Sequence, residues 1–256
     1  MCLLALSWQQ NADYPFLLAS NRDEFLQRPT RPANFWPEQP SILGSKDLEA
    51  GGSWLLTNKH GRWATLTNVR DGRDLTAGSV SRGELVLEAL QQPLSELPAW
   101  LAANQANFAG FNLLWGDEQQ AWYFSNRLAK PARQLKAGLY VLSNATLATE
   151  WPKTRRLKTA IETWQATDGC HPTQLFALLA DSTLAADKDL PNTHIGLETE
   201  RFLSSIFIKG ENYATRTSTL VWQTADGYWH LHERNHPANQ KLVNEQQFKW
   251  KNSPSN

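Results

Sequence analysis

Short apolar runs separated by turn-forming residues characterise the first seventy positions of the chain. Runs at 3–8 and 16–19 flank a turn cluster that ends in Pro15. Two such runs joined by a turn predict a β-hairpin, and the same pattern recurs between Trp54 and Thr67. The proline-rich segment from Pro29 to Pro40, between the two hairpins, predicts extended loop.

Helical spacing appears later in the chain. Ser81-Arg82-Gly83-Glu84 matches a capping box before an apolar run at 85–90. Leu157, Ala160, Ile161 and Trp164 follow the i, i+3, i+4, i+7 spacing of one helix face, with Thr149 as the expected cap. The remaining expected elements are helices near 98–106 and 175–179, and strands near 111–115, 122–125, 139–143, 205–209, 218–223 and 228–232.

The order of these elements indicates the fold class. Antiparallel hairpins alternate with blocks of helices, which favours α+β layering over a doubly wound parallel sheet. No linker-like segment divides the 256 residues. We therefore expect residues 1–256 to form a single domain.

Composition narrows the classes of function. Twenty-five basic residues balance 25 acidic ones without a basic stripe, which argues against a nucleic-acid partner. No apolar run approaches the ~20 residues of a membrane span. Two cysteines, Cys2 and Cys170, make no disulfide framework, so a cytoplasmic location is expected. Twelve tryptophans indicate a thick core or the wall of a pocket.

Cys2 is the first candidate for chemistry. Removal of Met1, which the small side chain of Cys2 favours, would leave a thiol and a free α-amino group on one residue. The pKa of an α-amino group is about 7.7–8, so part of it is unprotonated near neutral pH. The amine can then take the thiol proton, directly or through water, which is the logic of a self-activated nucleophile.

Asn21-Arg22-Asp23-Glu24 follows the second apolar run. Four polar residues in that position usually form a solvated turn. In a hairpin they would instead lie beside residue 2, where Arg22 would hold the thiolate and Asp23 would bind the ammonium group.

Three further residues complete the candidate set. Asn68 and Asn144 each end an expected strand, where a side-chain amide can stabilise an oxyanion; an ordinary turn residue is the alternative. Arg216 lies inside the hydroxyl-rich strand segment Tyr213–Thr219, which also fits a plain polar sheet face.

A series of short motifs resembles the NRDE-motif family, also called the transport and Golgi organisation family. The resemblance runs in order from residue 2 to about residue 222. Ser53, the pair Thr193-His194, and Ala214 depart from the usual threonine, Thr-Gly pair and glycine. The motifs are Met1-Cys2, Asn21-Arg22-Asp23-Glu24, Gly51-Gly52-Ser53-Trp54, Leu66-Thr67-Asn68, Ser81-Arg82-Gly83, Gly110-Phe111-Asn112-Leu113-Leu114, Leu142-Ser143-Asn144, Trp151-Pro152-Lys153 and Thr215-Arg216-Thr217-Ser218-Thr219.

The resemblance implies a four-layer αββα sandwich of the N-terminal-nucleophile hydrolase type. It implies a cysteine amidohydrolase or acyltransferase acting on a carbon–nitrogen bond of a small-molecule substrate, without a cofactor. The site would contain Cys2, Arg22, Asp23, Asn68, Asn144 and Arg216, with the last one supporting the site or binding substrate.

A second hypothesis treats the fold as a binding or trafficking module for a hydrophobic ligand such as haem. The tryptophans and histidines are compatible with this function but do not select it. His230, His232 and His236 also suggest a metal site, yet no acidic cluster lies nearby in the sequence, so we expect no metal. Lys153, Arg155, Arg156 and Lys158 are expected to form a solvated basic face.

Overall fold

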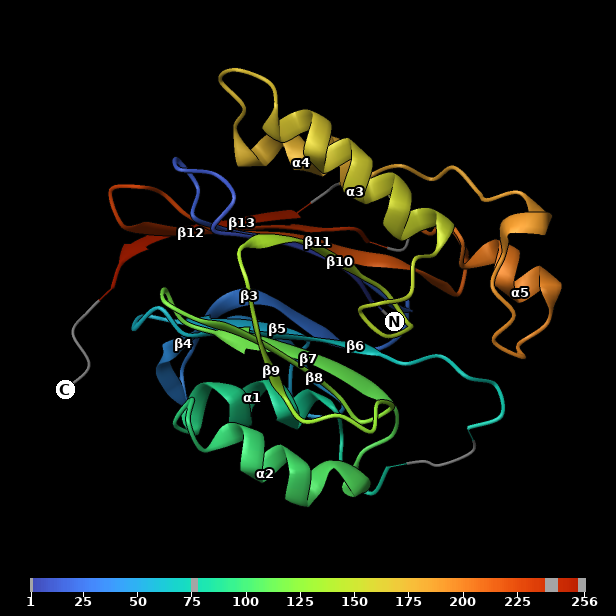
Figure 1. The fold of residues 1–256 in the computed structure, drawn as a ribbon, viewed down its shortest axis with the longest axis horizontal. Coiled ribbons are helices and arrows are strands. Elements are labelled where there is room, and N and C mark those ends of the chain that lie inside the picture. Colours follow the sequence, from blue (N-terminus) through green and yellow to red (C-terminus); the bar gives the residue numbers. More distant parts are fainter. Residues whose placement is uncertain (1, 75–77, 238–243, 253–256) are drawn as a thin grey trace.

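Two antiparallel sheets stack face to face, and helices cover the outer side of each sheet (Figure 1). The computed structural model describes residues 2–74, 78–237 and 244–252. Helices α3 (Pro152–Gln165) and α4 (Leu175–Leu179) lie over one sheet, and α1 (Gly83–Gln91) and α2 (Leu97–Asn104) over the other. The layers therefore follow the order α, β, β, α, and the fold class expected from the sequence is confirmed.

The sheet under α3 and α4 is called sheet A. Its central strands carry the start of the chain, because β1 pairs with β2 and β2 pairs with β11. In spatial order its strands are β10 (Gly138–Leu142), β1 (Cys2–Trp8), β2 (Phe16–Phe25), β11 (Tyr213–Gln223), β12 (Tyr228–Asn235) and β13 (Asn244–Lys251).

Sheet B, next to α1 and α2, is a meander in sequence order. Its strands are β3 (Thr30–Trp36), β4 (Gln39–Asp47), β5 (Leu55–Asn58), β6 (Trp63–Asn68), β7 (Phe111–Gly116), β8 (Ala121–Ser125) and β9 (Arg133–Leu135). A short helix, α5 (Leu197–Phe202), and 3₁₀ turns at Gln105–Asn107, Pro172–Gln174 and Asp187–Asp189 complete the regular elements of the described residues.

Strand β1 is apolar almost throughout because both of its faces are buried. Cys2, Leu4 and Leu6 join the core between the two sheets, whereas Leu3 and Ala5 pack under α3 and α4. Side chains alternate between the faces of a strand. The uninterrupted apolar run thus reflects a strand between two packed layers.

The sequence placed several elements correctly and misjudged others. Both hairpins form, and the helices near 98–106, 157–164 and 175–179 are present. The expected loop from Pro29 to Pro40 is wrong, because it contains β3 and the start of β4. Pro32 is accommodated because β3 is the edge strand of sheet B, where a missing amide hydrogen leaves no neighbour unpaired.

Other corrections concern element ends. The expected strand at 205–209 is irregular chain, while β9, β13 and α5 were not expected. Arg82, not Ser81, occupies the N-cap of α1, and no side-chain cap forms there. Trp151, not Thr149, occupies the N-cap position of α3. No helix in the described part of the chain has the length and apolar character needed to cross a bilayer.

Candidate functional site

The pairing of β1 with β2 sets Cys2 directly opposite Arg22. Opposed residues on neighbouring strands point to the same face, and here that face is turned towards sheet B. The tetrad Asn21-Arg22-Asp23-Glu24 therefore belongs to β2, which continues to Phe25. The alternative of a solvated turn after the strand is therefore wrong, and the expected closeness of these residues to residue 2 is confirmed.

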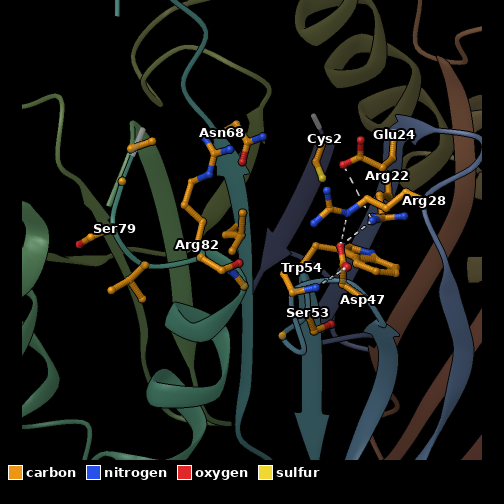
Figure 2. Close-up of a pocket in the computed structure, with 18 residues that line it drawn as sticks. Cys2, Arg22, Glu24, Arg28, Asp47, Ser53, Trp54, Asn68, Ser79 and Arg82 are labelled. Carbon is orange, nitrogen blue, oxygen red and sulfur yellow. Dashed lines mark hydrogen bonds and ion pairs between the residues drawn. The ribbon is translucent and has the colours of Figure 1, made fainter. Parts of the chain in front are cut away.

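Arg22 is fixed by contacts on several sides. Its Nη2 donates to Asp47 Oδ2 at 3.1 Å, and its Nη1 donates to Thr30 Oγ1 at 3.2 Å. The guanidinium also stacks over the Trp54 ring, 4.1 Å from the ring centre. Only 4% of the Arg22 side chain is exposed, so a fixed positive charge lies beside the thiol (Figure 2).

Asp23 points to the other face of β2, towards the helix layer. Its Oδ1 accepts a 2.6 Å hydrogen bond from Thr215 Oγ1 on β11. Burial raises the pKa of the Asp23 carboxyl, and the positive charge of Lys153 acts against that increase. Asp23 thus lies on the face of the sheet opposite to the one that carries the thiol of Cys2. Its charge can act on the backbone of residue 2, but its side chain does not face the thiol.

Lys153 corrects the expectation of a solvated basic face on α3. It is only 2% exposed, and its Nζ donates to the Leu203 carbonyl at 3.0 Å. Burial lowers its pKa to about 8, partly offset by Asp23. Arg155 is exposed and Arg156 and Lys158 are partly exposed, so only part of the basic run is solvated.

A cavity of about 380 Å³ opens beside Cys2, between the ends of the two sheets. Strands β1 and β2 form one wall, and the segment that leads into α1 forms the opposite wall (Figure 2). Polar and charged side chains dominate the lining. The polar or charged lining residues are Cys2, Arg22, Glu24, Arg28, Asp47, Ser53, Asn68, Ser79, Ser81 and Arg82.

Two of the sequence motifs meet in the wall of this cavity. The amide of Ser53 donates to the carbonyl of Gly83 at 3.2 Å. A β-carbon on Gly52 would lie 2.5 Å from the backbone of Gly83. Glycine at 52 is therefore required by the close approach of two main chains.

The two candidate asparagines have different positions. Asn68, at the end of β6, lines the cavity. Asn144 is 1% exposed and lies outside the lining set; its Nδ2 donates to the Asn68 carbonyl at 3.0 Å. Asn144 thus holds the backbone of the residue that faces the cavity. Direct contact of both amides with an oxyanion stays a prediction.

Arg216 lies in a bulge of β11 between Thr215 and Thr217. Its Nη1 donates to the carbonyls of Phe25 and Arg28, at 2.8 and 3.0 Å. It lines a different cavity, and its link to the Cys2 cavity is the backbone of Arg28. The structure therefore gathers Cys2, Arg22 and Asn68 around one space, with Asp23, Asn144 and Arg216 one layer behind.

Sequence reasoning did not propose Arg28, Asp47, Trp54 or Arg82 as site residues. Trp54 and Arg82 were visible only as members of the ordered motifs. Asp47 holds both Arg22 and Arg28, the latter at 2.7 Å. Because the expected loop at 29–40 hid β3 and β4, no sequence pattern pointed to Asp47.

Cys2 is 5% exposed. Burial raises its pKa above the usual range, and the charge of Arg22 acts in the opposite direction to a smaller extent. The thiol is consequently protonated at neutral pH. A thiol in this state needs a nearby base before it can act as a nucleophile.

The three C-terminal histidines do not converge on one point. His230 stacks on Trp222, His232 contacts Glu245 Oε2 at 3.0 Å, and His236 contacts Ser218 Oγ at 3.0 Å. Within the described residues, no three His, Cys, Asp or Glu side chains are grouped as a metal site would require.

Comparison with known proteins gives three consistent matches. The family model "Transport and Golgi organisation 2" matches residues 1–237. The "Transport and Golgi organization protein 2 homolog" of Homo sapiens is 32% identical over 239 residues, and that of Bos taurus is 31% identical over 243 residues; each alignment covers 86% of both chains.

A solved structure supports the same fold. It is the C2A mutant of conjugated bile acid hydrolase from Clostridium perfringens, with a TM-score of 0.53 and 10% sequence identity, covering 98% of this chain and 97% of that one. At this identity the likeness concerns the fold, which is of the N-terminal-nucleophile hydrolase type.

Proposed function

Because this chain belongs to the Transport and Golgi organisation 2 family and places Cys2 on a polar cavity, we propose that it is a cysteine hydrolase or acyltransferase. It acts on the amide bond of a small molecule after Met1 has been removed. The observation that carries the proposal is the position of Cys2, on the cavity and opposite the fixed guanidinium of Arg22.

The proposed first step forms a thioester. The α-amino group of residue 2 takes the thiol proton, and the sulfur attacks the carbonyl carbon of the substrate. The carbonyl electrons move to oxygen, where the Asn68 amide and the charge of Arg22 stabilise the oxyanion. The oxyanion then collapses, the carbon–nitrogen bond breaks, and the amine leaves with the proton held by the α-ammonium group.

The second step releases the acyl group. A water molecule gives a proton to the α-amino group and attacks the thioester carbon. Collapse of this second intermediate breaks the carbon–sulfur bond, returns the proton to sulfur and frees a carboxylic acid. An amine in place of water would make the same site an acyltransferase.

Burial of Cys2 gives the α-amino group its role in this scheme. Because the thiol pKa is raised, a thiolate does not form without a base. In this scheme the Asp23 carboxylate, on the other face of β2, keeps that amine oriented through its charge. Haem binding is less well supported at this cavity, since an apolar macrocycle would cover charged side chains such as Arg22, Glu24 and Asp47.

The test combines the mass of the mature protein with acylation of Cys2. We expect intact-mass analysis to find a chain without Met1. Incubation with a p-nitrophenyl ester should give one equivalent of p-nitrophenolate in a burst, with the acyl group on Cys2. Cys2→Ala should abolish the burst, and Cys170→Ala should retain it as the matched control.

Two results would contradict the proposal. One is a chain that retains Met1 and still turns over an amide. The other is an unchanged burst in Cys2→Ala. A saturable Soret shift with haem at micromolar protein, lost on mutation of the cavity, would instead favour the trafficking hypothesis.

A further inference from the structure

Three guanidinium groups and two carboxylates line the Cys2 cavity. Two of the three guanidiniums already have ionic partners. Arg22 binds Asp47 at 3.1 Å and lies 3.9 Å from Glu24, whereas Arg28 binds Asp47 at 2.7 Å and Glu49 at 3.2 Å. Both carboxylates of the lining are therefore engaged on the wall that β2 belongs to.

Arg82 is different. It forms no ion pair within residues 2–74, 78–237 and 244–252. The one hydrogen bond of its side chain in that part of the chain runs from Nη1 to the Gly110 carbonyl at 3.2 Å. The side chain lies on the wall opposite Cys2, beside Asn68 (Figure 2).

The position of Arg82 is costly without a ligand. Burial lowers the pKa of its guanidinium, and the nearby Cys2, Glu24 and Asp74 only partly offset this effect. A partly buried charge without a counter-ion loses hydration and gains little in return. An anionic ligand would offset the lost hydration energy of the guanidinium through charge-assisted hydrogen bonds.

We infer that the substrate of this cavity carries an anionic group, such as a carboxylate, which Arg82 binds opposite the thiol of Cys2. That the ligand is a substrate rests on the proposed function, but the anion site itself does not. The expected ligand is a small amide whose anionic group fits in the same cavity as its amide bond. Neutral amides of the same size bind less well.

The test compares two alkylating reagents of matched size, iodoacetate and iodoacetamide. In both, the thiolate sulfur of Cys2 bonds to the methylene carbon and iodide leaves. Only iodoacetate is anionic, so the ratio of the two rates, corrected by the ratio for free cysteine, measures attraction of an anion to the cavity. Peptide mapping separates labelling at Cys2 from labelling at Cys170.

We expect the corrected ratio to favour iodoacetate in the unaltered protein. Arg82→Gln should reduce the iodoacetate rate about tenfold or more, as expected for loss of a hydrogen bond between charged groups. The iodoacetamide rate should stay within about twofold. Arg82→Lys should retain most of the preference. Arg73→Gln, which removes an exposed charge outside the cavity, is the matched control.

Protection experiments identify the kind of anion. Propionate and inorganic phosphate are each tested against iodoacetate labelling of Cys2. Protection by either one supports the inference and indicates which oxyanion fits. Protection by neither, or an unchanged rate ratio in Arg82→Gln, overturns it.

The outcome is separable from that of the proposed function. An Arg82-dependent preference for iodoacetate without any acyl-enzyme would leave an anion-binding cavity and remove the hydrolase. An acyl-enzyme without that preference would leave the hydrolase and remove the anionic substrate.

Discussion

The four residues Asn21–Glu24 of strand β2 are divided between its two faces, and the two faces have different roles. Arg22 and Glu24 face the cavity with Cys2, whereas Asn21 and Asp23 face the layer of α3 and α4. Asn21 is fully buried, and its Nδ2 donates to the carbonyls of Leu179 and Ile206 at 2.8 and 2.9 Å. Two residues of the motif therefore line the site. The two that alternate with them bind the sheet to the helix layer.

This difference means that a motif is not equivalent to a site. Substitutions on the helix face should act on stability, and those on the cavity face on chemistry. The following variants test that division, beginning with the largest expected effect.

Asn21→Ala should destabilise the protein strongly. Besides its two donated bonds, Asn21 Oδ1 accepts from Ser218 Oγ at 2.7 Å. Loss of the amide leaves two buried carbonyls without their donor, and the Ser218 hydroxyl keeps only its contact with His236. We expect a cost of about 3 kcal/mol. Denaturant unfolding measures the loss, with the exposed Asn107→Ala as control. Unchanged stability would break the assignment of this face to structure.

Arg22→Gln should affect chemistry more than folding. We expect acylation of Cys2 to slow by about 10²-fold, or about 2.7 kcal/mol. Asp47 keeps its bond to Arg28, so unfolding should change by only about 1–2 kcal/mol. The measurement is the rate of the p-nitrophenolate burst, with the exposed Arg155→Gln as control. A normal burst in a destabilised protein would reverse the comparison.

Lys153 gives the helix face a pH dependence. Its pKa is 10.5 in ordinary surroundings and about 8 in the fold. Between pH 8 and 10.5, Lys153 is protonated in the unfolded chain but largely unprotonated in the folded chain. The free energy of unfolding therefore increases as the pH rises through this range. The gain is at most about 1.4 kcal/mol per pH unit. Lys153→Met should remove it.

The unfolding free energy of both proteins between pH 8 and 10.5 checks this prediction. Lys158→Met, a partly exposed lysine on the same helix, should keep the slope of the unaltered protein. Equal slopes in all three proteins would show that Lys153 does not titrate in that range.

Much of the fold could be read from local patterns. The first hairpin was predictable because each of its buried strands is an unbroken apolar run, and a cluster of turn-forming residues separates the two runs. Strand β13 was not, because its residues are mostly polar and exposed at a sheet edge. The strand at 205–209 failed because Ile206 is buried by packing in the cluster under α3 and α4, while the segment itself is irregular chain.

The site was predictable in part because strand register brings distant residues together. Once β1 and β2 formed a hairpin, Cys2 had to lie near Arg22. Which face each residue takes depends on the parity of the register, and the sequence alone did not decide that Asp23 would lie behind the strand. Arg82 approaches from sheet B and α1, so only tertiary packing places it opposite the thiol.

One departure from the family pattern has a local physical meaning. His194 stands where the related motif has glycine, and its φ is +61°. This left-handed conformation suits glycine best and costs a side chain about 1 kcal/mol. A glycine at this position would adopt the same backbone conformation at lower cost.

The contact between Gly52 and Gly83 limits how this cavity can be altered by engineering. A wall made of two touching main chains presents no side chain that could be shortened, lengthened or recharged. Redesign of ligand preference must therefore use other lining positions, among them Ser79 and Arg82. The glycine pair is a fixed part of the wall, so variation in specificity is left to the other side chains of the lining.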